Sequence, residues 1–263
     1  MISKKLVVEL FTVFFIVISA IYVFQLSDLV GNILYLIPPF LAFIAGLYAV
    51  RTYRLSNGHG QVMGLLTAGM LCWLIGEILF FYFQFISHNT PFPSIADAFY
   101  LVGYPLIFAG LTKEILIHKV DLKNFNKLYL TLVIMLVIVL IVIVSYFGVY
   151  KAYDQTQTFL SNAISIAYGI GDLILIVPGL FILKIALDYA GGKLYNSWVL
   201  ILLGLIATLG GDILFAIFRK SYTKLVWPYT LIDLFYIISY LLFSYSFFYT
   251  ATTIRSLHAK LVK

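Results

Sequence analysis

The chain is poor in cysteine and in charged residues, and it has no polar stretch long enough for a separate soluble domain. Its 263 residues include one cysteine, Cys72, which excludes an intramolecular disulfide. Charged residues make up 11% of the chain and hydrophobic residues 63%, whereas an ordinary soluble domain has about 25% charged residues. A soluble protein of this composition could not cover its own surface with polar groups, so we expect an integral membrane protein.

Motifs of common catalytic and metal sites are also missing. The sequence contains no HExxH, no GxSxG, no P-loop and no GxGxxG. Its four histidines, His59, His88, His118 and His258, fall in predicted loops or the tail without metal-ligand spacing, so we expect neither a metal nor a cofactor. The net charge of +6 resides at predicted helix ends, where the membrane accounts for it, and we expect no nucleic-acid binding.

Eight apolar stretches are each long enough, at about 20 residues, to cross a bilayer as a helix. We therefore predict an all-α integral membrane protein with eight transmembrane helices. The predicted spans are Leu6–Leu26, Leu29–Val50, Val62–Phe85, Ile95–Leu116, Leu128–Val149, Phe159–Leu183, Tyr195–Phe218 and Leu231–Ala251. The fifth span contains no charged residue and is expected to face lipid.

The basic residues of the connecting segments predict the orientation. Four of the 17 Lys and Arg residues, Lys151, Arg219, Lys220 and Lys224, belong to one side, and the other thirteen belong to the side of both termini. Because cytoplasmic loops are enriched in Lys and Arg, we expect both termini in the cytoplasm. The expected location is the cell (plasma) membrane, which the chain crosses several times.

Two halves of the sequence share a pattern. Residues of the third and fourth predicted spans match residues of the seventh and eighth at an offset of 135 or 136 positions. The matched pairs are Gly69 and Gly204, Gly76 and Gly211, Glu77 and Asp212, Asp97 and Asp233, Tyr100 and Tyr236, and Tyr104 and Tyr240. This order predicts two parallel four-helix repeats, residues 1–123 and 124–263, joined in one membrane domain.

The glycines of this pattern form two stripes, Gly69 with Gly76 and Gly204 with Gly211. A spacing of seven places both glycines of a stripe on one helix face, where a second helix can approach closely. We expect the third and seventh spans to pack centrally, against each other, which would bring their acidic residues toward the same interior volume.

Glu77 and Asp212 are the acids placed deepest in this pattern. They lie about 10–12 Å from the outer ends of their spans, at 1.5 Å per residue, and a charged side chain at the bilayer centre costs at least ~2.5 kcal/mol. Each could be a structural group hydrogen-bonded between helices, or a site for a ligand, a cation or a proton. Arg219 follows Asp212 by seven residues on the same face and could partner it loosely.

A polar face runs along the sixth predicted span, where Ser161, Ser165, Tyr168 and Asp172 fall at helical spacing. Such a face should lie against other helices or a cavity, since lipid would leave it unpaired. Trp73, one turn before Glu77, could form an aromatic wall of that cavity or belong to ordinary core packing. The candidate ligand-binding residues are Glu77, Asp172, Asp212, Tyr168 and Trp73, and no catalytic residue is assigned.

Two further acids have local sequence contexts that predict a structural role. Ser94 and Asp97, and likewise Thr230 and Asp233, have the spacing of a capping box, in which a hydroxyl and an acid satisfy the first N–H groups of a helix. We expect all four residues to be helix caps.

The motifs resemble those of the multi-spanning N-terminal membrane sensor regions of bacterial cyclic-di-GMP signalling proteins. The similar residues are Trp73-x-x-Gly76-Glu77, the run PSIADAFYL at 93–101, Tyr104-Pro105-Leu106, Gly110-Leu111 and the run AYGIGDL at 167–173. The resemblance covers most of the chain and implies a membrane sensor. Because only a short tail follows Thr252, it also implies that signals pass to a partner protein.

A second resemblance is to the lysoplasmalogenase-like family, which also has eight spans. The residues that carry it are Gly76-Glu77 and Gly211-Asp212, with Glu77 at a position where that family has aspartate. It implies a carboxylate pair that acts as general acid and base on a lipid vinyl ether.

Together these features favour a membrane-embedded sensory or ligand-binding module with an outward-opening polar cavity, acting through a signalling partner. The alternatives are a carboxylate-pair lipid hydrolase, a small-solute or ion transporter, and a structural subunit. The expected partners are the lipid bilayer and a small ligand or lipid of unknown identity.

Overall fold

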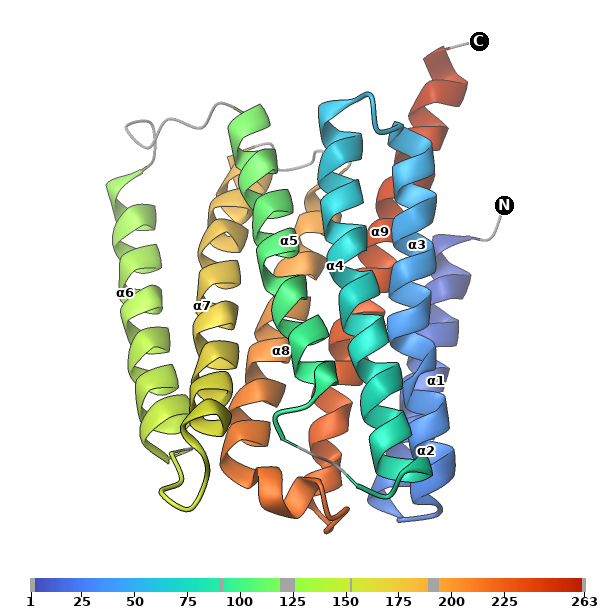
Figure 1. Cartoon of the computed structure of the whole chain (residues 1–263). Helices are drawn as coiled ribbons and strands as arrows, with labels where there is room; N and C mark the ends of the chain where they lie inside the picture. Colours follow the sequence, from blue (N-terminus) through green and yellow to red (C-terminus); the bar gives the residue numbers. More distant parts are fainter. Residues whose placement is uncertain (1–2, 90–91, 119–125, 152, 189–193, 262–263) are drawn as a thin grey trace.

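The computed structural model describes residues 3–89, 92–118, 126–151, 153–188 and 194–261, and these residues form a helical bundle without strands (Figure 1). Within these ranges, eight helical segments are long and apolar enough to cross a membrane. Each overlaps one predicted span, so the all-α class and the eight spans are confirmed. The chain is a multi-pass membrane protein.

Several spans are built from more than one helical element. The elements are α1 (Lys4–Val23), α2 (Asp28–Tyr35), α3 (Ile37–Tyr53), α4 (Gly58–Phe81), the π-helix η1 (Tyr82–Ile86), α5 (Ile95–Ile117), α6 (Lys127–Ile143), the π-helix η3 (Val144–Lys151), α7 (Phe159–Asp188), α8 (Tyr195–Tyr222), the 3₁₀-helix η4 (Tyr229–Ile232) and α9 (Asp233–Leu261).

The ends of these helices follow from local sequence. Ser3, Ser27, Asn57 and Asn126 each accept a backbone N–H of the first turn that follows, which begins α1, α2, α4 and α6. Prolines at the start of α3 lack a backbone N–H, which explains why the second span is divided into α2 and α3.

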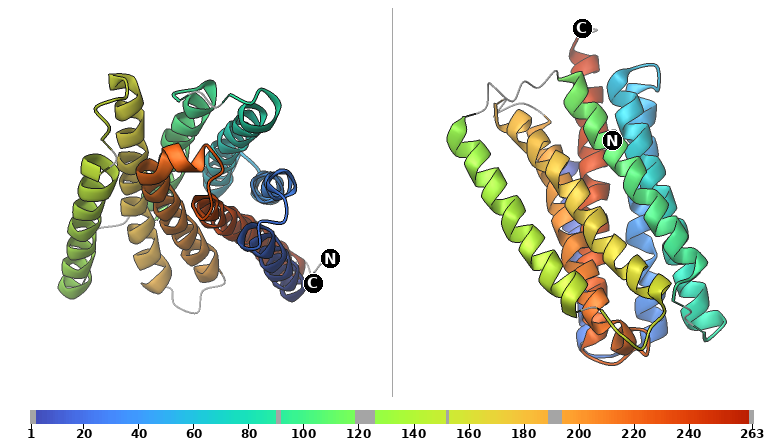
Figure 2. Two further views of the ribbon diagram at one scale, coloured as in Figure 1. Left: turned by 90° about the horizontal axis from the view of Figure 1, so that it is seen from below. Right: turned by 60° about the vertical axis from the view of Figure 1, so that its left-hand side comes forward.

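Six helices contact one another in a closed ring, in the order α3, α4, α5, α7, α8, α9 and back to α3. Outside this ring, α1 contacts α2 and α9, and α6 contacts α7 (Figure 2). Val133 is the one buried residue of α6, which agrees with the prediction that this span faces lipid. The ring therefore encloses the interior of the protein.

The glycine stripes face different neighbours from those predicted. A Cβ on Gly76 would press on Tyr100 of α5, and a Cβ on Gly211 would press on Tyr236 of α9; the other two glycines meet the same two helices. The predicted central packing of α4 against α8 is wrong, because the small residues let each helix approach the one that follows it in the chain.

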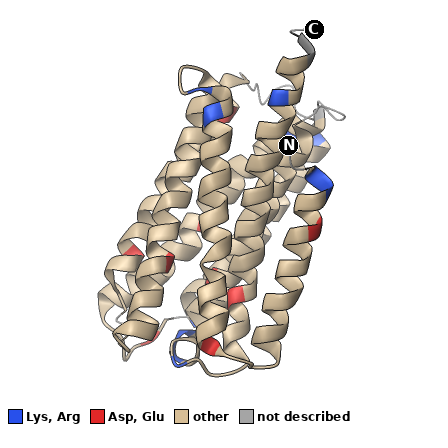
Figure 3. Cartoon of the chain, turned by 90° about the vertical axis from the view of Figure 1, so that its right-hand side faces the viewer, with Lys and Arg blue, Asp and Glu red and all other residues tan. Residues whose placement is uncertain are grey.

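Both termini lie at the same end of the bundle (Figure 1). Lys and Arg gather toward the ends of the helices, whereas several acidic residues lie along the bundle (Figure 3). The predicted boundary between the repeats, at residues 123 and 124, lies outside the described residues.

Two histidines that were expected in loops belong to a half-buried cluster around Glu114, near the end that carries the termini. His59 lies in the first turn of α4 and His118 directly follows α5. His59 Nδ1 is 3.0 Å from one carboxyl oxygen of Glu114, and His118 Nδ1 is 3.8 Å from the other. Glu114 is thus a buried acid with imidazole partners, which the sequence did not predict.

Candidate functional site

A cavity with a volume of about 80 Å³ lies inside the ring, in the half of the bundle away from the termini. Its walls come from α2, α4, α5, α7, α8 and α9, and extend to Phe92, Ser94 and Thr223 in the adjoining loops. The walls include three acids, Glu77, Asp97 and Asp212, and seven tyrosines.

Glu77 is held by three tyrosine hydroxyls from three different helices. Tyr35 of α2 and Tyr240 of α9 donate to Oε1, at 2.9 and 2.8 Å, and Tyr100 of α5 donates to Oε2 at 2.9 Å. Three donors to one carboxyl match what a carboxylate accepts. The geometry therefore suits an ionised Glu77 that needs no further proton.

Asp212 and Asp172 form a different arrangement around a single hydroxyl. Tyr104 Oη is 2.7 Å from Asp212 Oδ2 and 3.1 Å from Asp172 Oδ1, and Tyr236 donates to Asp212 Oδ1 at 2.7 Å. The one proton of Tyr104 cannot satisfy both carboxylates, and Oδ2 of Asp172 is buried without any hydrogen-bond partner. This geometry favours a proton on the Asp172–Asp212 pair, because one carboxyl then becomes a donor.

The polar face of α7 is buried, as predicted. Ser161, Ser165, Tyr168 and Asp172 are each exposed by less than one tenth of their surface. Tyr168 lines the cavity, while Asp172 lies behind the wall and reaches it through Tyr104.

Trp73 also lines the cavity, and its indole N–H donates to the backbone carbonyl of Tyr100 at 3.1 Å. Its ring makes edge contacts with Tyr104 and Tyr240, at centroid distances of 5.7 and 6.3 Å. Trp73 therefore contacts one tyrosine that donates to Asp212 and one that donates to Glu77.

One predicted capping box is present and the other is not. Ser94 accepts the N–H of Ala96, and Asp97 accepts the N–H of Ser94 at 2.6 Å, which begins α5. Asp97 also accepts the hydroxyl of Tyr168 at 2.6 Å, so the capping acid belongs to the cavity wall as well.

For Thr230 and Asp233 the capping prediction is wrong. Thr230 lies inside η4, which begins after Pro228 without a side-chain cap, so its hydroxyl is not at the helix start. Asp233 accepts a hydrogen bond from the Tyr222 hydroxyl instead. The 3₁₀-helix η4 includes Thr230, which a capping box would need in an extended conformation before the helix start.

Arg219 is not the partner of Asp212. Its Nη1 donates to Ser165 at 2.8 Å, and its guanidinium lies 4.1 Å from the centre of the Phe92 ring. The long side chain reaches across to α7 and the loop rather than back along α8.

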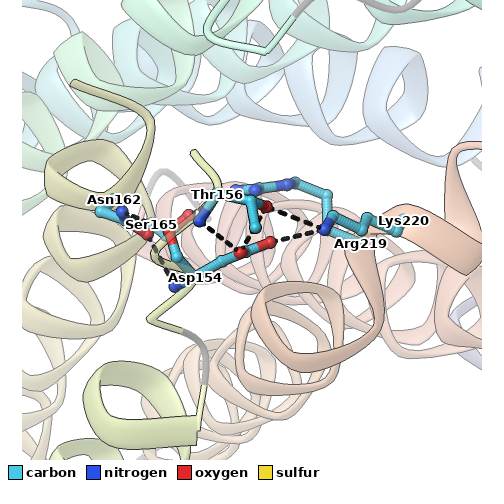
Figure 4. Close-up of polar contacts among 6 residues, drawn as sticks. All are labelled: Asp154, Thr156, Asn162, Ser165, Arg219 and Lys220. Atoms are coloured by element: carbon cyan, nitrogen blue, oxygen red, sulfur yellow. Dashed lines mark hydrogen bonds and ion pairs between the residues drawn. The ribbon is translucent and has the colours of Figure 1, made fainter. Parts of the chain in front are cut away.

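A polar cluster fastens the loop before α7 to the end of α8 (Figure 4). Lys220 Nζ lies 2.6 Å from Asp154, whose Oδ1 also accepts the N–H and hydroxyl of Thr156. The Asn162 side chain accepts the N–H of Asp154 and donates to its carbonyl oxygen. The Lys220 hydrogen bond, followed by those of Thr156, holds the pKa of the Asp154 carboxyl below its ordinary value.

A second hollow, between α5 and α7, is apolar. Its walls include Pro105 and Phe108 on one side and Ile174 and Pro178 on the other, with Gly171 at the base. Tyr104 lines both this groove and the polar cavity. The groove thus reaches the residue that joins Asp172 to Asp212.

The tyrosines are the residues that sequence reasoning missed. Apart from Tyr168, none of them was assigned to the site from the sequence, yet five tyrosines hold the buried acids Glu77, Asp172 and Asp212. The signal was present: Tyr100 and Tyr104, like Tyr236 and Tyr240, are one helical turn apart and recur in both halves.

Comparison with protein-family models, with curated proteins and with solved structures finds no match to this chain.

Proposed function

We propose that the protein is a membrane-embedded sensory or ligand-binding module whose ligand occupies the cavity beside Glu77 and Asp212. The observation that carries this proposal is a cavity bordered by buried acids within a membrane bundle. A purely structural acid needs a hydrogen-bonded neighbour but no open space beside it. Since intramembrane charge costs at least ~2.5 kcal/mol, acids next to a cavity favour a functional site.

The tyrosine contacts support the two parallel repeats, residues 1–123 and 124–263. In each half, the first tyrosine of the fourth helix donates to the acid of its own third helix: Tyr100 to Glu77 and Tyr236 to Asp212. The second tyrosine donates to the acid of the other half: Tyr104 donates to Asp212, and Tyr240 donates to Glu77. These two hydrogen bonds join the halves around the cavity.

The charge distribution supports an orientation with both termini in the cytoplasm of a cell whose plasma membrane holds the protein. In that orientation the cavity opens outward. A ligand from outside would then change the contacts among helices that end in the cytoplasm, and a partner protein would read the change there.

Mass spectrometry of small molecules that co-purify with the protein tests this function. The wild type and the Glu77→Gln, Asp212→Asn double variant are purified in mild detergent and denatured, and the released molecules are compared. We expect a species that the wild type releases and the double variant does not. The exposed Glu9→Gln variant is the matched control, because Glu9 pairs with Lys5 on α1, away from the cavity.

Identical bulk lipids from all three proteins would contradict a ligand site at these acids. A soluble metabolite lost from the double variant alone would support the sensory or ligand-binding module. A lysolipid lost from it would favour the second candidate.

That second candidate is a carboxylate-pair lipid hydrolase, and the apolar groove that reaches Tyr104 favours it. An acyl chain in the groove would bring a head group near Asp172 and Asp212 rather than near the pair Glu77 and Asp212. A carboxylic acid would protonate the vinyl ether and the paired carboxylate would direct water, so that the resulting hemiacetal splits into an aldehyde and an alcohol. Aldehyde release from a lysoplasmalogen that is lost in Asp172→Asn would establish it; no release by the wild type would exclude it.

A further inference from the structure

The described lining of the cavity contains acids but no Lys, Arg or His. Arg219 contacts Ser165 and the lining residue Phe92, and it lies close enough to Asp97 and Asp154 for electrostatic interaction. Arg219 can therefore balance Asp97, whereas Glu77 and Asp212 accept hydrogen bonds from tyrosine hydroxyls. Phenols donate hydrogen bonds without supplying positive charge.

The hydrogen-bond geometry favours negative charge in the cavity. The three donors around Glu77 suit the carboxylate form. One proton on the Asp172–Asp212 pair makes one of its two carboxyls a donor, and Oδ2 of Asp172 is buried without a hydrogen-bond partner. The pair then still carries one negative charge, and buried charges are stable when an opposite charge accompanies them.

The remaining walls of the cavity are aromatic. Trp73 and Phe80 of α4, Phe215 and Tyr222 of α8, and Phe92 of the loop before α5 border the same space. Aromatic faces attract organic cations electrostatically, and a ring of them around an acid is how quaternary ammonium groups are bound.

A metal ion suits this lining less well. Mg²⁺ and Ca²⁺ require six or more converging oxygens, and transition metals require clustered His, Cys or carboxylate ligands. Among the described residues, no group of three or more His, Cys, Asp or Glu side chains could hold a metal ion. The lining therefore favours a soft, weakly hydrated cation over a metal.

From the acids, the aromatic walls and the lack of a lining base, we propose that the ligand of this cavity is a small organic cation, an amine or quaternary ammonium compound. Its positive group lies between Glu77 and Asp212, and its carbon atoms contact the aromatic walls around Trp73. This inference rests on the proposed ligand-binding function and names the chemical class of the ligand.

Binding of choline to the full-length protein, compared with its uncharged isostere 3,3-dimethylbutan-1-ol, tests the inference. Both probes are titrated into protein in which Trp198→Phe and Trp227→Phe leave Trp73 as the sole tryptophan, and Trp73 fluorescence is recorded. We expect saturable choline binding, and binding of the isostere weaker by about tenfold or more, because cation–π and charge contacts are absent.

Glu77→Gln removes one charge while keeping a side chain of the same shape, and we expect it to weaken choline binding by about tenfold. Glu9→Gln is the matched control and should leave binding unchanged, since Glu9 is exposed beside Lys5. Thermal unfolding of each variant shows that it is folded before the titration is interpreted.

Equal affinity for choline and the isostere would overturn the inference while leaving a ligand-binding cavity in place. The inference would also be overturned if choline showed no saturable binding below about 10 mM while a neutral or anionic molecule co-purified with the wild type and not with Glu77→Gln. If nothing co-purifies and neither probe binds, the proposed function fails together with the inference.

Discussion

Two buried glutamates, Glu114 and Glu77, show how differently this bundle treats a carboxyl group. Both are nearly inaccessible, at 3% and 7% exposure. Glu114, near the end that carries the termini, lies against the imidazoles of His59 and His118, at 3.0 and 3.8 Å. Glu77, beside the cavity, has three phenols. One acid has bases within its own cluster, and the other has a space beside it.

The neighbours of each acid determine whether its charge can be balanced within the protein. A buried acid with an ionisable base nearby can be neutralised by the protein alone, and it fastens helices α4 and α5 together. An acid surrounded only by hydroxyl donors keeps its charge or takes up a proton or a cation from outside. The contrast in neighbours is the basis of the proposal that Glu114 is a structural acid and Glu77 a binding acid.

Removing the Glu77 carboxyl is the change with the largest expected effect on stability. Glu77→Leu leaves three buried tyrosine hydroxyls without an acceptor, and we expect a loss of about 3 kcal/mol or more in the free energy of unfolding. Glu77→Gln keeps acceptor capacity and should lose about 1 kcal/mol. Thermal unfolding in detergent measures both; a Leu variant as stable as the wild type would show that the tyrosines do not depend on the acid.

Loss of the Tyr104 hydroxyl should cost more stability than loss of the Tyr100 hydroxyl, although both line the same cavity. Tyr104→Phe removes the group that joins Asp172 to Asp212, and we expect a loss of about 2 kcal/mol in unfolding free energy. Tyr100→Phe leaves Glu77 with two other donors and should cost about 1 kcal/mol or less. The same unfolding assay ranks the two variants, and the reverse order would contradict the proton-sharing pair.

Weakening the Glu114 cluster should affect stability but not binding. His59→Ala removes the closer imidazole, and we expect a loss of about 1 kcal/mol in unfolding free energy. Choline binding measured through Trp73 should stay at the wild-type affinity. Reduced choline affinity in a folded His59→Ala protein would contradict the claim that the Glu114 cluster is structural and independent of the binding site at Glu77.

The sequence was sufficient where structure depends on neighbouring residues. The eight spans follow from long apolar runs, the cap at Ser94 from a three-residue spacing, and the buried face of α7 from helical periodicity. Each of these is decided within one or two helical turns, so a pattern along the chain is enough to recognise it.

Contacts between distant segments were not predictable in this way. The Tyr240 hydroxyl meets Glu77 across 163 positions of the chain, and no local pattern says which acid a tyrosine will reach. The glycine stripes reveal a close approach but not the identity of the approaching helix. Thr230 and Asp233 have the spacing of a cap, yet the 3₁₀ turn of η4 prevents it.

The smallest effect is expected at the Asp154–Lys220 ion pair, which belongs to neither glutamate cluster. Because the pKa of Asp154 is lowered in the folded protein, the pair stabilises the fold fully above the ordinary aspartate pKa of about 4 and loses this contribution as the pH falls below it. Lys220→Ala should lower the unfolding temperature slightly at pH 7, and this difference should shrink progressively as the pH is lowered below about 4 toward the depressed pKa of Asp154. An effect of the same size at pH 7 and at about pH 2 would contradict an electrostatic role.

The most direct test of a binding acid beside a structural acid is the co-purified ligand of three proteins: the wild type, Glu77→Gln and Glu114→Gln. Each is purified in the same detergent, denatured, and its released small molecules are quantified by mass spectrometry. We predict that one species is released by the wild type and by Glu114→Gln and is lost from Glu77→Gln. Equal release from all three proteins, or loss from both variants alike, would contradict the assignment of Glu77 to a ligand site.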